Sequence, residues 1–169
     1  MELGLRGKVA LVTGSSRGIG LATAKAFAAE GCRVMLSARS AEQLRETEEA
    51  LRATGAEVAA HAVDVGTPDD AARLIEVTVK AYGGIDILVN NVGGGGGGAR
   101  VADSSDDDWR GALERNLVQT VRMMRLALPH MKDRPGAAVI NVASISGWSP
   151  RRIGPTSRAA ATSQRSMRH

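Results

Sequence analysis

Short apolar segments alternate with amphipathic ones along this chain, and this alternation constrains its fold more than any other feature. Five segments have the length and the Val, Leu and Ile content of buried strands, although the third is the weakest. They are residues 8–14 (KVALVTG), 32–38 (CRVMLSA), 57–65 (EVAAHAVDV), 84–91 (GIDILVNN) and 136–144 (GAAVINVAS). Strand, helix, strand is thus repeated four times, which predicts right-handed crossovers and a parallel sheet of the α/β class.

The intervening helices carry start and stop signals. The first is expected from Ile19 to Glu30. Ser40 can cap the second, with Gln43 as its capping-box partner and Gly55 beyond its end. Thr67 and Pro68 mark the start of the third, and Gly83–Gly84 follow its end.

The fourth helix, over residues 109–134, has the clearest apolar spacing. Its apolar residues recur at steps of three and four: Trp109, Leu113, Leu117, Val121, Met124, Leu128 and Met131. Asp106–Asp108 lie at its positive end and Pro135–Gly136 terminate it.

Length and composition fit one domain with an aliphatic core. The chain has 169 residues and only 2% aromatic residues, so the core must consist of Val, Leu, Ile and Ala. No segment approaches the about 18 apolar residues of a membrane span, and no signal peptide is evident. Cys32 is the only cysteine, which excludes an internal disulfide and fits a cytoplasmic location. The three histidines are scattered, so no metal site is expected.

The net charge of +4 is concentrated at one end. Residues 151–169 contain five arginines and no acidic residue, so residues 1–150 together carry −1. We therefore divide the chain into one domain over 1–150 and an irregular basic tail over 151–169. A short basic tail is typical of a solvated extension, and nucleic acid is not expected as a partner.

The segment TGSSRGIG, Thr13 to Gly20, follows the first strand directly and opens the first helix. Gly14, Gly18 and Gly20 allow a tight turn and the close approach of a phosphate, which the helix N-terminus then attracts. A purely structural turn is the alternative. The strand-to-helix context favours nucleotide phosphate binding.

Five motifs in this order resemble the short-chain dehydrogenase/reductase family over roughly residues 5–149. They are TGSSRGIG, Asp64–Val65, NNVG (Asn90–Gly93), RNLVQTV with Asn116, and VINVASISG with Ser144. The resemblance implies a doubly wound Rossmann-type sheet of order 3-2-1-4-5. It also implies further strands and a substrate-covering lobe beyond the fifth strand, which the 169 residues do not contain, so that the chain looks C-terminally truncated.

The resemblance assigns cofactor contacts to several positions. Ser15, Ser16, Arg17 and Ile19 lie within the glycine turn. Asp64 and Val65 would flank the adenine, unless Asp64 is only a solvated strand-end residue. Asn90, Asn91 and Gly93 would line the floor near the adenine-side ribose. The six glycines 93–98 would continue beside the nicotinamide or simply form a connector.

The residues near the end of the second strand favour NADP(H) over NAD(H). An NAD-binding protein usually has an acidic residue there, bonded to the ribose 2′-hydroxyl. Here Ala38 takes that place and Arg39 follows, with Arg17 in the glycine turn. Two guanidinium groups suit a 2′-phosphate. The alternative is that either arginine is an ordinary surface charge.

The resemblance also assigns catalytic roles. Asn116 matches the asparagine that positions a water, and Ser144 matches the serine that bonds the substrate oxygen. A helix-kinking or core amide is the alternative for Asn116, and a strand-end hydroxyl is the alternative for Ser144.

The catalytic tyrosine and lysine of the family have no match. The single tyrosine, Tyr82, lies before the fourth strand, at an expected packing position. By spacing, Ser157 and Ala161 take the Tyr and Lys places; by local likeness, Gly154 and Arg158 do. None is a phenol, and loss of a positioned acid typically costs about 10²–10⁴ in rate.

Two functional hypotheses follow. One is an NADP(H)-dependent oxidoreductase acting on a small carbonyl or secondary alcohol, impaired by the missing pair. The other is an inactive nucleotide-binding remnant, with a tail produced by truncation or a frameshift. A homo-oligomer through helix 109–134 is compatible with both, and no membrane partner is expected.

Overall fold

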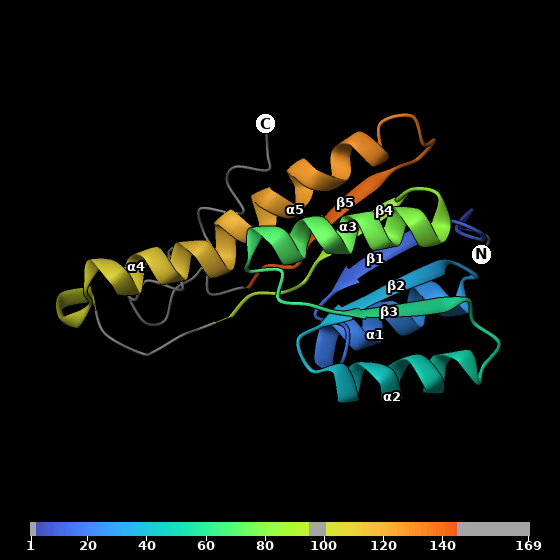
Figure 1. The fold of residues 1–169 in the computed structure, drawn as a ribbon, viewed down its shortest axis with the longest axis horizontal. Coiled ribbons are helices and arrows are strands. Elements are labelled where there is room, and N and C mark those ends of the chain that lie inside the picture. The colour runs from blue at the N-terminus through green and yellow to red at the C-terminus, as the bar shows by residue number, and fades with distance from the viewer. Residues whose placement is uncertain (1–2, 95–100, 145–169) are drawn as a thin grey trace.

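The computed structural model describes residues 3–94 and 101–144, which form a parallel sheet between two layers of helices (Figure 1). The strand order β3-β2-β1-β4-β5 confirms the predicted doubly wound topology. Every pairing in this sheet is parallel. The strands are shorter than the apolar segments that predicted them: β1 (Val9–Thr13), β2 (Arg33–Ala38), β3 (Val58–Ala62), β4 (Ile87–Asn90) and β5 (Ala138–Asn141).

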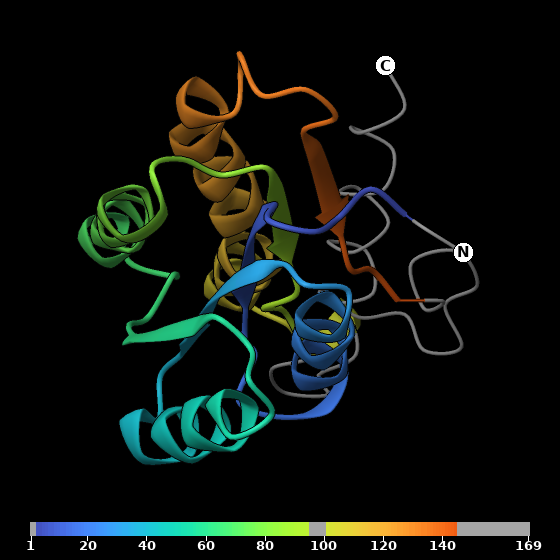
Figure 2. The ribbon, with the colours of Figure 1, turned by 90° about the vertical axis from the view of Figure 1, so that its right-hand side faces the viewer.

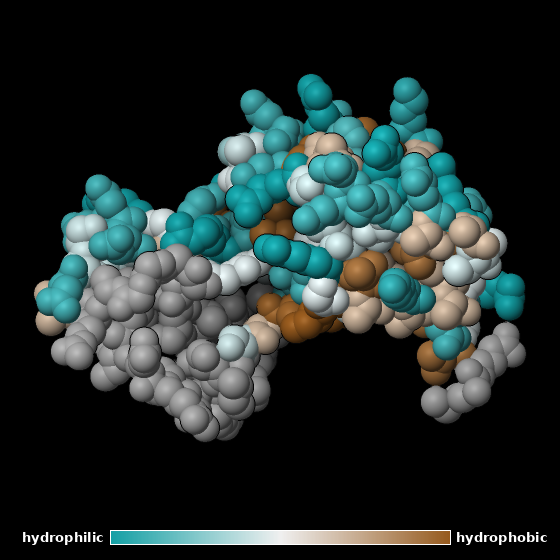
Figure 3. All heavy atoms as spheres, turned by 90° about the horizontal axis from the view of Figure 1, so that it is seen from below, coloured by the Kyte–Doolittle hydropathy of each residue, from teal (hydrophilic) through white to brown (hydrophobic). Residues whose placement is uncertain are grey.

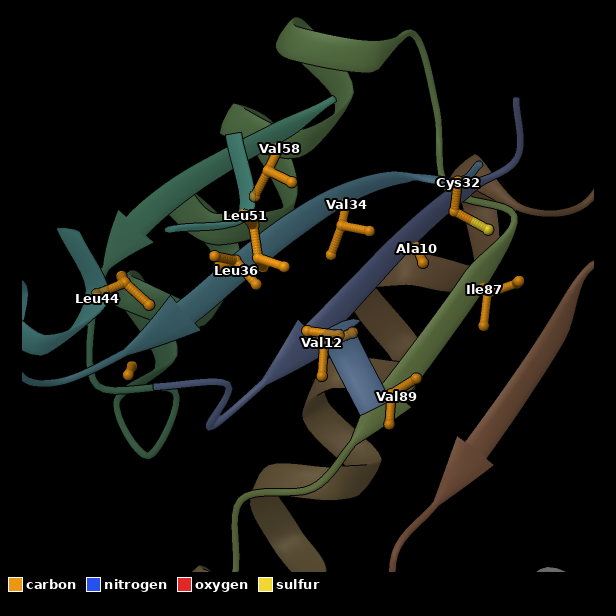
Figure 4. Packing of buried hydrophobic residues seen from close by; sticks show 12 residues of the cluster. Ala10, Val12, Cys32, Val34, Leu36, Leu44, Leu51, Val58, Ile87 and Val89 are labelled. Atoms are coloured by element: carbon orange, nitrogen blue, oxygen red, sulfur yellow. The ribbon is translucent and has the colours of Figure 1, made fainter. Parts of the chain in front are cut away.

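Helices cover the two faces of the sheet, as the view in Figure 2 shows. On one side lie α1 (Gly18–Ala29) and α2 (Ala41–Arg52); on the other lie α3 (Pro68–Tyr82) and α5 (Gln119–Ala127). Successive strand residues point to opposite faces, so each strand contributes to both layers. Val12 and Val89 pack on the α1 side (Figure 4), whereas Leu11 and Leu88 pack on the α3 side. All four are fully buried, because a parallel sheet covered on both faces has no solvated side.

Helix boundaries follow the predicted caps closely. Ser40 Oγ accepts a hydrogen bond from Gln43 N at 3.4 Å, and Thr67 Oγ1 accepts one from Asp70 N at 3.3 Å. Gly83, with φ 79°, ends α3 in the left-handed conformation that glycine adopts without steric cost. These local signals set where the loops at both ends of the sheet begin.

The fourth predicted helix is a composite in the structure. It comprises α4 (Asp106–Leu113), a π-helical turn η2 (Glu114–Val118), α5, and a 3₁₀ turn η3 (Leu128–His130). The π turn adds a residue to the helical repeat, so the buried face follows the predicted apolar stripe only in part. Met123, Ala127 and Met131 are buried, while Val121 and Leu128 are 45% and 52% exposed.

Strand β5 is the last strand in the sheet order of the described residues. Ile140 is in register with Val89 and therefore shares the α1 face of the sheet, yet it is 42% exposed, and Val142 is 38% exposed. On the surface shown in Figure 3, hydrophobic side chains emerge in the middle of a largely hydrophilic face. Among the described residues, the apolar surface beside β5 is therefore partly exposed.

An ion cluster fixes the opposite, amino-terminal end of the sheet. Asp86, 3% exposed, accepts two hydrogen bonds from the Arg134 guanidinium at 2.9 and 2.8 Å and one from Val9 N at 2.8 Å. Burial alone would raise the pKa of Asp86, but these hydrogen bonds outweigh it and hold the pKa below its usual value. Lys8 Nζ lies 3.7 Å from the same carboxylate. The cluster joins the start of β1, the start of β4 and the segment leading into β5.

Within the described ranges, no helix combines the length and apolar content needed to cross a membrane.

Candidate functional site

The predicted site residues gather at the carboxyl-terminal edge of the sheet. Because all strands run parallel, the segments after β1, β2, β3, β4 and β5 meet at this edge. Ligands of open α/β sheets bind there, where the strand order reverses. In this sheet the reversal falls between β1 and β4, directly beside the glycine turn.

The glycine turn is as tight as its sequence predicts. Gly14 and Gly18 have φ values of 65° and 57°. A Cβ on Gly20 would lie 2.2 Å from the carbonyl oxygen of Gly14, so no larger residue fits at that position. The turn delivers the chain to the first residue of α1, whose leading N–H groups have no partner within the helix. Among the described residues, no side chain caps this helix end.

Two serines hold the glycine turn on the sheet. Ser15 is fully buried, and its N–H donates to the carbonyl oxygen of Ser37 at 3.0 Å. In return, Ser37 N donates to Ser15 Oγ at 2.9 Å. Ser15 therefore has a structural partner on β2, while the neighbouring Ser16 stays partly accessible.

Asn91 joins the glycine turn to the end of β4. Its Nδ2 donates to the carbonyl oxygens of Thr13 and Gly14 at 3.0 and 3.2 Å. Its backbone N–H donates to Thr13 Oγ1 at 3.0 Å, and that hydroxyl donates to Val89 O at 3.1 Å. Asn91 is thus a clamp for the turn, because its Nδ2 bonds the backbone at the end of β1 and at the first glycine of the turn.

Three exposed side chains surround the glycine turn. Arg17 is the N-cap residue of α1, Ile19 is 64% exposed, and Arg39 directly follows β2. The two guanidinium groups place positive charge at the carboxyl ends of β1 and β2.

The Asp64–Gly66 loop lies after β3. Asp64 Oδ1 accepts a hydrogen bond from Gly66 N at 2.9 Å, and Asp64 N donates to Asp70 Oδ2 at 3.0 Å. The carboxylate is partly exposed, whereas the Val65 side chain is buried in the core on the α3 side. A ligand at this loop would therefore meet the Asp64 carboxylate and the Val65 backbone.

Asn90 and Asn141 face each other at the ends of β4 and β5. Asn90 Nδ2 donates to Asn141 Oδ1 at 2.8 Å. Asn90 is 5% exposed, and its Oδ1 is buried without a donor among the described residues. The pair links the two last strands of the sheet at the site edge.

Asn116 lies in the π turn and reaches the loop after β4. Its Oδ1 accepts from Gly94 N at 3.0 Å, while its Nδ2 donates to Gly94 O at 3.2 Å and to Ala112 O at 2.9 Å. Neighbouring Gly93 leaves room for this contact, since a Cβ there would lie 3.2 Å from Asn116 Oδ1. The structure thus brings Asn116, from one motif, beside Gly93 and Gly94, which follow β4.

Ser144 is exposed and follows β5 at the same edge of the sheet. The candidate Tyr and Lys places, Gly154, Ser157, Arg158 and Ala161, lie outside the described residues, as do glycines 95–98.

Tyr82 belongs to the other end of the molecule. It ends α3, and its hydroxyl donates to the carbonyl oxygen of Val34 near the start of β2 at 3.4 Å. The Arg33 guanidinium lies 5.6 Å from the centre of its ring. Burial, followed by the charge of Glu57, raises the pKa of Tyr82 to about 12. Packing, as predicted, accounts for this tyrosine.

Sequence reasoning missed three residues that build the site. Thr13 and Ser37 anchor the glycine turn, and Gln119 Nε2 donates to Val92 O at 2.8 Å. Thr13 and Ser37 could have been found from the sequence, because each is a polar residue at or near the end of an otherwise apolar strand. Gln119 interrupts an apolar helix and is only 4% exposed, which sequence alone does not reveal.

No group of three or more potential metal ligands occurs in residues 3–94 and 101–144.

The chain is similar to known proteins in sequence and in structure. The chain is 36% identical over 146 residues to dehydrogenase/reductase SDR family member 4 from Sus scrofa, covering 86% of this chain and 52% of that protein. The structure of L-sorbose reductase from Gluconobacter frateurii, complexed with NADPH and L-sorbose, has a TM-score of 0.92 and 37% identity, over 98% of this chain and 63% of that one.

A further similar structure has an unusual site. It is the NADPH-bound short chain oxidoreductase from Pseudomonas aeruginosa PAO1 that contains an atypical catalytic center. Its TM-score is 0.88 and its identity 34%, over 94% of this chain and 62% of that one. The chain thus spans about half the length of the curated relative and less than two thirds of these structures.

The family model described as short chain dehydrogenase matches residues 8–161, from the first strand into the basic tail. The matched segment contains the glycine turn, the Asn91 clamp and Asn116 in its π turn. The chain therefore belongs to the short-chain dehydrogenase/reductase family, as its five motifs predicted.

Proposed function

We propose that this chain binds NADP(H) at the carboxyl-terminal edge of its sheet and serves hydride transfer to or from a small carbonyl or secondary alcohol. One observation carries the proposal: a turn that only glycine can form, at Gly20, leads the chain into an uncapped helix N-terminus. Backbone N–H groups in this arrangement bind phosphate. The residues present therefore fit a dinucleotide.

Each predicted contact has a suitable group in the structure. The turn with Ser16 and the α1 N-terminus would hold the pyrophosphate, and Ile19 would pack against the cofactor with its exposed side chain. The free oxygen of the Asp64 carboxylate would accept the adenine amino group, because Oδ1 already accepts from Gly66 N. Asn90 and Gly93 would form the floor beneath the ribose.

Arg39 and Arg17 would select NADP(H) by pairing with the 2′-phosphate. Both side chains are exposed, and no acidic residue stands at the end of β2 to bond a 2′-hydroxyl. Two similar proteins of known structure, L-sorbose reductase and the Pseudomonas aeruginosa oxidoreductase, bind NADPH, which supports the same choice here.

Titration with NADPH and NADH tests this choice, with Arg39→Ala as the variant. We expect wild type to prefer NADPH, and Arg39→Ala to lose about tenfold or more of NADPH affinity, which corresponds to ~1.4 kcal/mol. NADH affinity should change little. Equal affinity of wild type for both cofactors, or an unchanged preference in the variant, would contradict the proposal.

Turnover is a separate question, because the sequence has no tyrosine after Ser144. The nicotinamide, when bound, supplies or accepts the hydride, and Ser144 and Asn116 would orient the substrate oxygen and a water. The proton donor of the family is missing, so we expect turnover to be weaker than in the family by about 10²–10⁴.

The missing tyrosine favours a second candidate, a cofactor-binding protein without turnover. A screen of carbonyl substrates with NADPH distinguishes the two. Binding with no turnover supports the second candidate, while turnover at rates ordinary for the family would show that another group donates the proton.

A further inference from the structure

Two side chains of α5, Gln119 and Arg122, bond the two loops that flank the adenine side of the proposed cofactor site. Arg122 Nη1 donates to the carbonyl oxygen of Gly66 at 2.9 Å. One turn earlier, Gln119 Nε2 donates to Val92 O at 2.8 Å and also to Arg115 O. The helix therefore reaches both the loop after β3 and the loop after β4.

The Arg122 guanidinium has a fixed orientation. Its side chain is only 12% exposed, and its Nη2 donates to Glu114 Oε1 at 2.6 Å. A planar guanidinium bonded in two directions loses its freedom to rotate away from either partner. Partial burial limits screening of this ion pair by solvent. Arg122 is thus a rigid donor aimed at the Gly66 carbonyl.

Gly66 links Arg122 to Asp64 through two backbone hydrogen bonds. The Gly66 carbonyl oxygen accepts from Arg122, and the Gly66 N–H donates to Asp64 Oδ1 at 2.9 Å. A glycine has no side chain to restrict its backbone, so these two hydrogen bonds act directly on it, beside the bond from Thr67 N to Asp64 O at 2.9 Å that closes the loop. The direction of the Asp64 carboxylate then depends on where Arg122 holds Gly66.

We propose that Arg122, oriented by Glu114, is a positioning residue for the adenine half of the cofactor. It contacts neither the adenine nor the reacting atoms; it fixes the Asp64–Gly66 loop in the conformation that presents the Asp64 carboxylate. This proposal rests on the proposed function, since it assumes that the adenine binds beside Asp64.

Calorimetric titration with adenosine 2′,5′-bisphosphate, which carries the adenine half alone, is the first test. We expect Arg122→Met to weaken its binding about tenfold, near the lower end of what a hydrogen bond from a charged donor contributes. Arg125→Met is the matched control, because Arg125 lies on the same helix, has the same charge and is exposed. We expect Glu114→Gln to act in the same direction as Arg122→Met, with a smaller effect.

Hydrogen exchange of the ligand-free protein is the second test. In Arg122→Met, the amides of Gly66 and Thr67 should exchange faster, while those of β1 and β2 keep their protection. A general loss of stability would instead raise exchange throughout the sheet. Arg122→Lys keeps the charge and most of the side-chain stem, so it should fold even if the Met variant does not. Because an ammonium lacks the planar fork that holds Gly66 and Glu114 in two directions, we expect the same local change in exchange.

The outcomes separate the two proposals. If wild type binds no adenosine bisphosphate, the proposed cofactor site is wrong, and the exchange experiment still shows whether Arg122 orders the loop. If wild type binds it and Arg122→Met binds it equally well, the positioning role is wrong. Unchanged protection of Gly66 and Thr67 in both Arg122 variants would also overturn it.

Discussion

Gly20 shows how one residue determines whether the glycine turn can form. A Cβ at this position would lie 2.2 Å from Gly14 O and 2.5 Å from Asn91 Nδ2. The first of these atoms belongs to the backbone and cannot move without opening the turn. Both the turn and its clamp would therefore be displaced by a single methyl group.

We predict that Gly20→Ala lowers the free energy of unfolding by about 1–3 kcal/mol, the usual cost of overpacking, and weakens NADPH binding at least tenfold. Urea unfolding and cofactor titration measure the two effects. Gly111→Ala is the control, because its new methyl group would meet only the flexible Arg115 guanidinium. Equal behaviour of the two variants would show that the turn tolerates a side chain.

Tyr82 gives a second prediction at the scale of one residue. As the only tyrosine in the chain, it alone produces the tyrosinate absorbance signal. We expect an alkaline titration midpoint at about 12, compared with about 10 in the unfolded chain. Because the folded pKa is the higher one, the associated stability is fully present below pH ~10 and disappears as the pH approaches 12.

Tyr82→Phe should abolish the signal and remove this pH dependence. A midpoint near 10 in protein that circular dichroism shows to be folded would mean that the ring is not buried against β2.

Among the secondary-structure elements, β1, β4 and the segment entering β5 depend on one carboxylate. Replacing Asp86 by Asn leaves Arg134 and Lys8 without their anion, and removal of one partner from a buried pair typically costs 3–5 kcal/mol. We predict a loss of about 3 kcal/mol for Asp86→Asn in urea unfolding. Asp107→Asn, which breaks a solvent-exposed pair with Arg110, should cost less than ~1 kcal/mol.

The free energy of unfolding measured as a function of pH in the acid range provides a second test of Asp86. Its pKa is lowered in the folded protein, so its contribution is present above the unfolded value near ~3.9 and lost as the pH falls through the folded value. Asp86→Asn should remove this part of the dependence below pH ~4. If Asp86→Asn shows the same acid dependence of the free energy of unfolding as wild type, other carboxylates determine that dependence.

The order of elements and their caps could be predicted from sequence, because strand and helix periods, Ser40 and Thr67 are local signals. The split of the last helix could not. Its π turn contains Asn116, whose side chain bonds Gly94 across 22 residues, a contact that no local pattern encodes. The site residues within the motifs could be identified because each motif is a local pattern. Gln119 and Arg122 could not, because their partners lie 27 and 56 residues away in the sequence.

At the scale of the whole molecule, exposed apolar side chains along η2, α5 and η3 support the homo-oligomer that the sequence analysis considered through helix 109–134. Val118, Val121 and Leu128 are 40%, 45% and 52% exposed. If a second copy covers this face, Val121→Glu should reduce the mass measured by analytical ultracentrifugation from dimer or tetramer toward monomer. Gln43→Glu adds the same charge on exposed α2 and should leave the mass unchanged. A monomeric wild type would contradict the proposal.

The Asn91 clamp has a consequence for the order of events during synthesis. Its side chain bonds Thr13 and Gly14 across 78 and 77 residues, so the glycine turn lacks this anchor until β4 lies beside β1. Closing a loop of that length costs chain entropy, which only the assembled sheet offsets. In a nascent chain that has released only its first two strands from the ribosome, the glycine turn should therefore be held by the Ser15–Ser37 contact alone, although the whole glycine motif has already emerged.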